Sequence, residues 1–203
     1  PSHCLLIDKD QRVFKKKYWD IDLKNRNTTI SIDEAALKFT ELFTKSITRR
    51  LRSDVPVGSS LSGGLDSSSI VMFIDRMKSG LQIQKTFSAR FEGFVRDEGK
   101  YIEKVLAEIN VQPYHVFLTP EGLIGELDKV CYYQEEPFGS TSVIAQWEVM
   151  KLAKKNDVTV LMDGQGADEV LAGYFYYFDS FFSSLFRNDR SEFFRQRNCF
   201  KEL

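Results

Sequence analysis

The stretch SSLSGGLDSSS, residues 59–69, decides the fold of this 203-residue chain. It follows the apolar run VPV and precedes a segment in which Ile70 and Ile74 recur at helical spacing. These features predict a strand, a Ser-Gly-Gly turn and a helix, in that order. Gly63 and Gly64 permit a tight turn and a close approach of an anion to the backbone. Because the first amides of a helix bind anions, we expect a pyrophosphate-sized site here.

The turn has the composition of a phosphate-binding loop but lacks the lysine of the Walker motif. We expect the hydroxyls of Ser62, Ser67 and Ser68 to add hydrogen-bond donors. Asp66 is unusual in such a place, because a carboxylate repels phosphate unless a cation lies between them, and Mg²⁺ is the natural candidate. Taken alone, these residues leave open an ordinary tight turn in which the helix dipole favours Asp66.

Strands and helices alternate after this turn. Buried strands are predicted at residues 55–61, 85–91, 114–118 and 158–164, with helices at 97–110 and from about residues 120 and 141. This order implies a doubly wound, mostly parallel α/β sheet with helices on both faces. Ligands bind at the carboxyl ends of such strands. We therefore expect one cleft, lined by the loops at residues 61–68, 89–97 and 163–169.

The chain divides into three regions by pattern. Residues 1–30 are polar around a short apolar run and indicate a linker or the end of a preceding domain. Residues 31–173 form the predicted core, which begins with a helix at residues 32–52 capped by Ser31 and Glu34. Residues 174–203 are rich in aromatic side chains and predict a helical C-terminal extension. We expect a piece of a longer polypeptide, because the sequence starts without methionine and stops within this stretch.

Composition excludes some classes of partner. The chain has 28 basic and 29 acidic residues, a formal net charge of -1, so no global field attracts nucleic acid or an anionic membrane. No apolar run approaches the roughly 18 residues needed to span a bilayer. The 3 cysteines are far apart and in no metal-ligand spacing, which favours free thiols in a reducing compartment. We expect a cytoplasmic protein.

Several motifs resemble one known family. SGGLDSS resembles the pyrophosphate loop of the N-type ATP pyrophosphatases, and LMDGQGADEVLAGY at residues 161–174 resembles the asparagine synthetase branch of that superfamily. TFSARF, the pair Asp97 and Glu98, and EEPFGSTS follow the family's order, and YWDID is similar to its connection between glutaminase and synthetase domains. The resemblance covers roughly residues 18–177. It implies an adenine nucleotide alpha hydrolase-like fold.

The resemblance also implies a reaction. In this family ATP and a carboxylate give an acyl adenylate and pyrophosphate, and ammonia then displaces AMP to form an amide. The implied substrates are ATP with Mg²⁺, aspartate, and ammonia from glutamine, with asparagine as the product. The ammonia would come from a glutaminase domain that is absent from this chain. The oligomeric state stays open, with a homodimer as one alternative.

Site residues follow from the motifs that match. Asp66 and Asp168 match the family's Mg²⁺-binding aspartates, and Gln165 occupies the catalytic position beside them. Backbone contacts to adenosine are implied at Leu61, Ala89 and Gly164. The full set of implied ATP or pyrophosphate contacts is Leu61, Ser62, Gly63, Gly64, Leu65, Asp66, Ser67, Ser68, Ala89, Asp163, Gly164 and Glu169.

The sequence departs from the family pattern in a few places. Gln165 stands where many asparagine synthetases have glutamate, and Asp163 where serine is common. Cys4 does not match the glutaminase nucleophile, and the family's catalytic lysine lies beyond this chain's end, so Lys201 is not assigned that role. Two alternatives stay open: an amide ligase for another carboxylate, of glycan, secondary-metabolite or β-lactam type, and a catalytically inactive nucleotide-binding module.

Overall fold

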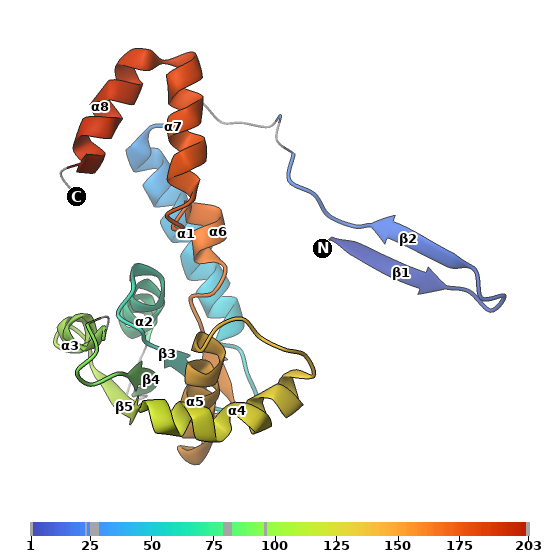
Figure 1. Ribbon diagram of the computed structural model, residues 1–203, viewed down its shortest axis with the longest axis vertical. Coiled ribbons are helices and arrows are strands. Elements are labelled where there is room, and N and C mark those ends of the chain that lie inside the picture. Colours follow the sequence, from blue (N-terminus) through green and yellow to red (C-terminus); the bar gives the residue numbers. More distant parts are fainter. Residues whose placement is uncertain (1, 23, 25–28, 79–82, 96, 202–203) are drawn as a thin grey trace. The chain divides into compact units, whose positions relative to one another are not determined.

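The computed structural model describes residues 2–22, 24, 29–78, 83–95 and 97–201 (Figure 1). The chain forms two compact units, Pro1–Phe43 and Thr44–Leu203. Each unit is described by itself below.

The first unit contains an antiparallel hairpin of β1 (His3–Ile7) and β2 (Val13–Lys17), which the sequence did not predict. One carboxylate oxygen of Asp8 closes the turn by accepting bonds from the backbone N–H groups of Asp10 and Arg12, both at 2.9 Å. Side chains on both faces are exposed, including Leu5 at 60% and Phe14 at 52%. The hairpin therefore has no apolar core of its own.

The helix α1 (Ile32–Arg50) starts at the predicted capping box. The backbone N–H of Ser31 donates to Glu34 Oε2 at 2.9 Å, and the N–H of Glu34 donates to Ser31 Oγ at 3.2 Å. The predicted start is thus confirmed. The helix continues into the second unit, where Ile47 is buried.

The second unit is built on a parallel sheet with the strand order β5-β4-β3-β6. Its strands are β3 (Val57–Ser60), β4 (Gln84–Arg90), β5 (Val111–Phe117) and β6 (Val160–Met162). In the central pairs, Ser59 aligns with Thr86 on one side and with Met162 on the other. Pro113 lies in β5 without disrupting the ladder because β5 is an edge strand.

Helices cover both faces of the sheet (Figure 1), as predicted for a doubly wound fold. On one face, Val71 of α2 (Leu65–Met77) and Ile102 of α3 (Gly99–Leu106) pack with Leu61. On the other face, Val149 of α5 (Ser142–Lys155) packs with Phe87 of β4. The helix α4 (Pro120–Gln134) packs on α5.

The winding reverses between β3 and β6. From β3 the chain runs outward through α2, β4, α3 and β5, and then returns through α4 and α5 to place β6 on the other side of β3. This reversal is a topological switch point, where doubly wound sheets bind ligands outside the carboxyl ends of the strands. The loops at residues 61–64 and 163–166 lie at this position.

Some element boundaries differ from prediction. The strand β6 and the helix α3 are shorter than residues 158–164 and 97–110, whereas β5 starts earlier, at Val111. For the helix from about residue 120, the sequence predicts an apolar stripe that includes Ile124. In α4, however, Ile124 is 72% exposed, because α4 packs on α5 and buries only a narrow strip around Val130. The sequence also predicts that the helix after the phosphate loop ends at Gly80, which lies outside the described residues.

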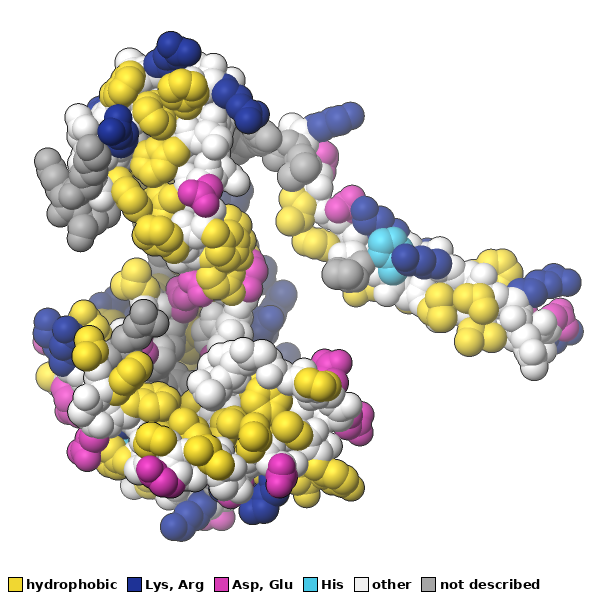
Figure 2. Space-filling model, in the orientation of Figure 1, with side chains coloured by type: hydrophobic (Ala, Val, Ile, Leu, Met, Phe, Trp, Pro, Cys, Tyr) yellow, Lys and Arg dark blue, Asp and Glu magenta, His cyan; other side chains and the backbone are white. Residues whose placement is uncertain are grey.

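The predicted helical C-terminal extension, residues 174–203, contains α7 (Tyr177–Asn188) and α8 (Arg190–Lys201). The short helix α6 (Ala167–Leu171) precedes it, within the predicted core. An aromatic cluster joins α7 to α8, with the rings of Phe178 and Phe182 lying 4.8 and 5.5 Å from that of Phe200. Other apolar side chains of the two helices stay exposed, among them Phe181, Phe186 and Phe194. Figure 2 shows apolar side chains gathered over α7 and α8. No helix in the described residues is long and apolar enough to cross a membrane.

Candidate functional site

The phosphate loop, residues 61–68, leaves the sheet abruptly after β3. Leu61 is 1% exposed, and its backbone N–H still bonds to the carbonyl of Phe87 in β4 at 2.9 Å. Gly63 then adopts φ +85°, a left-handed conformation that favours glycine. Gly64 is the N-cap of α2. The predicted strand, Ser-Gly-Gly turn and helix are confirmed.

The serine hydroxyls of this loop have different roles. Ser62 Oγ and Ser67 Oγ lie 2.9 Å apart, Ser67 Oγ accepts the N–H of Ser62, and Ser62 Oγ accepts the N–H of Gly64 at 3.3 Å. These bonds hold the turn in shape. Ser68 Oγ is buried and has no hydrogen-bond partner in the part of the chain that the structure describes. Since buried hydroxyls are normally paired, the Ser68 hydroxyl is a candidate hydrogen-bond donor for a ligand.

Gly63 lies against the first turn of α3. A Cβ atom placed on Gly63 would lie 2.9 Å from Cβ of Tyr101 and 3.2 Å from the carbonyl oxygen of Glu98. No side chain fits there without displacing α3. Burial, followed by the charge of Asp97, raises the pKa of Glu98 beside this contact.

The loop after β6 packs on the first turn of α2. A Cβ on Gly164 would lie 3.0 Å from both Cβ of Asp66 and the backbone nitrogen of Ser67. Two loops that are about 100 residues apart in sequence therefore meet at the switch point, as a doubly wound sheet requires. Gly164 is needed for this close approach rather than for an unusual backbone angle.

Asp66 and Asp168 interact across these two loops. Burial raises the pKa of Asp66, and the negative charge of Asp168 raises it further. Such repulsion is relieved when a cation binds between the carboxylates. No group of three or more His, Cys, Asp or Glu side chains is placed to hold a metal among the described residues. A cation here would have to complete its coordination with ligand or water oxygens.

Other predicted residues near Asp168 are held by neighbours. One carboxylate oxygen of Asp163 accepts bonds at 3.3 Å from Ser60 Oγ and from Gln146 Nε2. The hydroxyl of Tyr174 donates to Glu169 at 2.7 Å, which lowers the pKa of Glu169 and raises the pKa of Tyr174 to about 12. The sequence did not indicate any of these three partners.

Four predicted site residues remain. Leu65 is the first residue of α2, and its side chain is 87% exposed. Gln165 is exposed in the loop after β6. The side chains of Leu61 and Ala89 pack into the cores on opposite faces of the sheet. Leu61 is fully buried, so only its backbone groups are left for a ligand, whereas Ala89 is partly buried. The adenosine contacts stay a prediction.

A family model described as asparagine synthase matches residues 38–201. The chain belongs to the asparagine synthase family. It is 37% identical over 172 residues to a protein named putative asparagine synthetase [glutamine-hydrolyzing] 2 from Methanocaldococcus jannaschii, covering 84% of this chain and 32% of that protein. It is 33% identical over 174 residues to asparagine synthetase [glutamine-hydrolyzing] 1 from Bacillus subtilis, covering 86% of this chain and 27% of that protein.

More distant likenesses extend this comparison. A protein named amidase chyE from Penicillium rubens is 26% identical over 188 residues, covering 86% of this chain and 28% of that protein. The solved structure of an NH3-dependent NAD synthetase from Campylobacter jejuni matches with a TM-score of 0.45 and 17% identity, covering 68% of this chain and 60% of that one. This likeness is too weak to add to the family assignment. The chain spans about a third or less of the length of its asparagine synthetase relatives.

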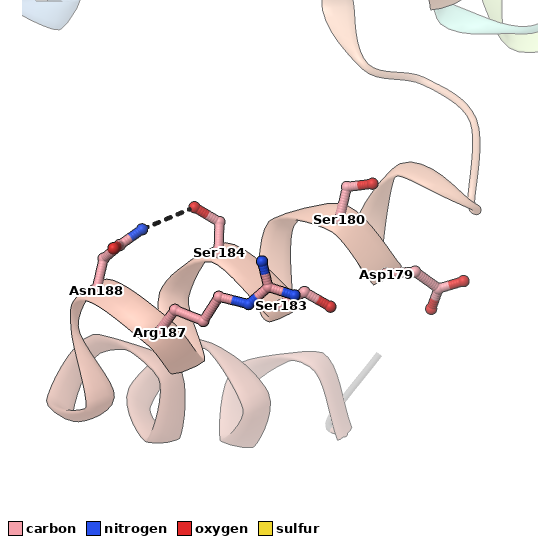
Figure 3. Close-up of a pocket in the computed structure, with 6 residues that line it drawn as sticks. All are labelled: Asp179, Ser180, Ser183, Ser184, Arg187 and Asn188. Atoms are coloured by element: carbon pink, nitrogen blue, oxygen red, sulfur yellow. Dashed lines mark hydrogen bonds between the residues drawn. The ribbon is translucent and has the colours of Figure 1, made fainter.

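A separate hollow lies on α7, far from these motifs in the sequence (Figure 3). Its volume is about 440 Å³, and it is lined by Asp179, Ser180, Ser183, Ser184, Arg187 and Asn188. Asn188 Nδ2 donates to Ser184 Oγ at 3.3 Å along the same helix face. None of the predicted site residues of this asparagine synthase family member lines it, so it is not part of the candidate site.

Proposed function

We propose that this chain is the nucleotide-binding core of a ligase that uses ATP to convert a carboxylate into an amide. The observation that carries the proposal is the convergence of the phosphate loop with Asp168 at the switch point of the sheet. Membership of the asparagine synthase family supports it. The substrate assigned is aspartate, with ammonia derived from glutamine, in line with the names of the relatives.

The residues present fit a nucleotide. The unpaired Ser68 hydroxyl and the N–H groups at the start of α2, including those of Leu65 and Asp66, are donors suited to phosphate oxygens. Asp66 and Asp168 would hold Mg²⁺, with Glu169 close in sequence as a supporting carboxylate. Adenosine would contact backbone groups of Leu61, Ala89 and Gly164. Bound Mg²⁺ would supply neutralisation of the charge that develops on the departing pyrophosphate.

The proposed chemistry has two steps. A carboxylate oxygen of the substrate attacks the α-phosphorus of ATP; an O–P bond forms, the bond from the α-phosphorus to the bridging oxygen breaks, and pyrophosphate leaves with the electron pair. Ammonia then attacks the acyl carbon, a C–N bond forms, the C–O bond to AMP breaks, and the nitrogen loses a proton. Donors of the phosphate loop favour the first step because they stabilise the leaving pyrophosphate.

Gln165 has a limited part in this scheme. A neutral amide cannot accept the proton that the attacking nitrogen loses, so we assign Gln165 to hydrogen bonding with the adenylated substrate. Water or another group takes the proton. This assignment predicts that Gln165→Ala slows amide formation more than it weakens ATP binding.

Each of the three regions of the chain is assigned to a part of the proposed enzyme. Residues 31–173 would form the synthetase core, and residues 174–203 would begin a helical C-terminal region. Residues 1–30 would be the end of a preceding glutaminase domain that supplies ammonia. The exposed apolar side chains on both faces of the β1–β2 hairpin support this part, because an isolated two-stranded hairpin is marginally stable in water.

A second candidate is an amide ligase for a carboxylate other than aspartate. It is favoured by Gln165 and by the likeness to a protein named amidase. Release of AMP from ATP, measured with aspartate and then with a panel of other carboxylates, distinguishes the two candidates.

Calorimetric titration with a non-hydrolysable ATP analogue tests the proposed function. We expect the wild-type chain to bind the analogue more tightly with Mg²⁺ than without it. Asp66→Asn and Asp168→Asn should each weaken the Mg²⁺-dependent binding by about tenfold or more. Asp179→Asn on α7, an exposed acidic position outside the site, serves as the control. Absence of binding to the folded wild-type chain, or binding indifferent to Mg²⁺ and to both substitutions, would contradict the proposal.

A further inference from the structure

An ion pair closes the loop between β4 and α3. Arg90 is the last residue of β4, and its Nε and Nη2 atoms donate to both carboxylate oxygens of Asp97 at 2.9 to 3.2 Å. Both side chains are largely buried, at 17% and 16% exposure. Paired donors in this geometry fix the orientation of both groups. Hydrogen bonding from Arg90 is the main reason that the pKa of Asp97 is lowered.

The same ion pair also contacts the surrounding backbone and a neighbouring strand. Asp97 also accepts the N–H groups of Phe91 at 2.8 Å and Gly99 at 3.3 Å. The guanidinium of Arg90 lies 5.9 Å from the ring centre of Phe117, at the end of β5. The pair therefore joins the ends of two strands, the loop between β4 and α3, and the first turn of α3.

This first turn of α3 is the surface on which Gly63 rests. A Cβ on Gly63 would meet Tyr101 and the N–H of Ile102, at 2.9 and 3.1 Å. Gly99, at the start of the same turn, has no room for a side chain because the guanidinium of Arg90 occupies the space. The ion pair therefore packs against the first turn of α3, and this turn packs against Gly63 of the phosphate loop.

We propose that Arg90 and Asp97 are positioning residues for the phosphate loop: their ion pair holds the first turn of α3 against Gly63 and so sets the backbone that receives pyrophosphate. The inference rests on the proposed function. Neither residue contacts the ligand; both act through Tyr101 and Ile102. Small displacements of positioning groups weaken a site strongly, because the donors must converge on one set of oxygens.

The alternative is that the pair only stabilises the fold. If the pair is purely structural, its loss should lower thermal stability without changing the affinity of the folded protein for its ligands. If the pair positions the loop, its loss should weaken the binding of ligands that occupy the phosphate loop. The binding of ligands held mainly by the adenosine contacts at Leu61, Ala89 and Gly164 should not change.

The experiment measures the affinities of Mg²⁺-pyrophosphate and AMP by calorimetry on the 203-residue chain. The variants are Arg90→Lys, which keeps the charge but loses the paired donors, and Asp97→Asn. The control is Arg195→Lys on α8, where Arg195 makes a similar paired contact with Glu192 in an exposed setting. We expect pyrophosphate binding about tenfold weaker in both Arg90 and Asp97 variants. AMP binding, and both affinities of the control, should stay within about twofold of wild type.

Thermal unfolding accompanies each titration to establish that the variant is folded. Folded variants that bind pyrophosphate as wild type does, or that lose both ligands equally, would overturn the positioning role and leave the proposed function standing. Wild-type protein that binds neither ligand would overturn both. If Asp97→Asn does not fold, the conservative Arg90→Lys decides. Hydrogen exchange on the wild type adds a check: pyrophosphate should slow exchange of the Tyr101 and Ile102 amides, and unchanged rates there would contradict the proposal.

Discussion

Gly164 packs directly on Asp66, because a Cβ on this glycine would lie 3.0 Å from Cβ of Asp66. The contact joins the loop after β6 to the first turn of α2. It bears on how near Asp168, which follows in the first turn of α6, comes to the carboxylate of Asp66. We therefore expect this glycine to influence the separation of the two proposed Mg²⁺ ligands.

Gly164→Ala should separate the two loops. The added methyl group would lie 3.0 Å from atoms of Asp66 and Ser67, so these neighbours, which include backbone, would have to move. We expect Mg²⁺-dependent binding of an ATP analogue to weaken by about tenfold or more, as misplacement of a site permits. Stability should fall by about 1–3 kcal/mol, the usual cost of overpacking. Calorimetry and thermal unfolding measure the two effects.

Gly125→Ala is the matched control for this substitution. Gly125 lies inside α4 with open space around its Cα, so alanine should stabilise the chain by about 0.5–1 kcal/mol through helix propensity. Its nucleotide affinity should equal that of wild type. Equal nucleotide affinities for wild type, Gly164→Ala and Gly125→Ala would mean that neither loop needs Gly164 to keep its position.

The Asp66 carboxyl should make the ligand-free protein less stable as pH rises. Its pKa is raised above 3.8 by burial and by Asp168, so the folded chain binds the proton more tightly than the unfolded chain does. The stability from this group is therefore fully present below pH 3.8 and is lost as pH rises through the folded pKa. At pH 7 without Mg²⁺, Asp66→Asn should raise the free energy of unfolding by up to about 1 kcal/mol.

Thermal unfolding at pH 4 and pH 7 measures this linkage. The advantage of the variant should be larger at pH 7, with a shift of the midpoint of about 2–4 °C for a chain of this size. Mg²⁺ should raise the midpoint of wild type and leave that of the variant nearly unchanged. An advantage that shrinks from pH 4 to pH 7 would show that attraction between Asp66 and the dipole of α2 outweighs the repulsion from Asp168.

Much of the fold was predictable because its signals are local. The Ser-Gly-Gly turn needs a residue with positive φ, and Gly63 provides it; the capping box at Ser31 specifies its own hydrogen bonds. The β1–β2 hairpin was missed because it buries little, so its strands lack the apolar alternation that identifies a strand. The exposure of Ile124 was missed because it depends on what α4 packs against.

The candidate site was predictable in its motifs but not in its internal bonds. The resemblance to the asparagine synthetase branch paired Asp66 with Asp168, and the parallel strands account for their two loops lying at one edge of the sheet. The bond from Gln146 to Asp163, the bond from Tyr174 to Glu169 and the Arg90–Asp97 pair join residues by tertiary packing or side-chain rotamer. No spacing in the sequence indicates such bonds.

Gly58→Ala tests the packing of β3 against its neighbours. A methyl group there would lie 2.8 Å from the ring of Phe87 and 3.0 Å from the carbonyl oxygen of Lys85. Because Phe87 is fully buried, it cannot move aside without disturbing the core on that face. We expect a loss of about 1–3 kcal/mol in chemical denaturation. A neutral outcome would mean that the ring of Phe87 has room that the packing does not indicate.

Phe182→Ala should loosen the α7–α8 hairpin and leave the candidate site intact. The ring of Phe182 lies 5.5 Å from that of Phe200 and 6.0 Å from that of Phe193, so it bridges the two helices. Because the ring is only partly buried, its loss should cost about 1–2 kcal/mol, below the range for a fully buried phenylalanine. Near-ultraviolet circular dichroism and amide exchange in α7 and α8 report the loosening.

Phe194→Ala provides the control, since Phe194 is 51% exposed and its ring contacts the neighbouring Phe193 of the same helix. It should change stability by less than about 0.5 kcal/mol. Both variants should bind the ATP analogue as wild type does, because the phosphate loop draws its contacts from α2, α3 and the loop after β6. Weaker nucleotide binding in Phe182→Ala alone would show that the α7–α8 hairpin supports the site, and the boundary proposed at residue 174 would then be wrong.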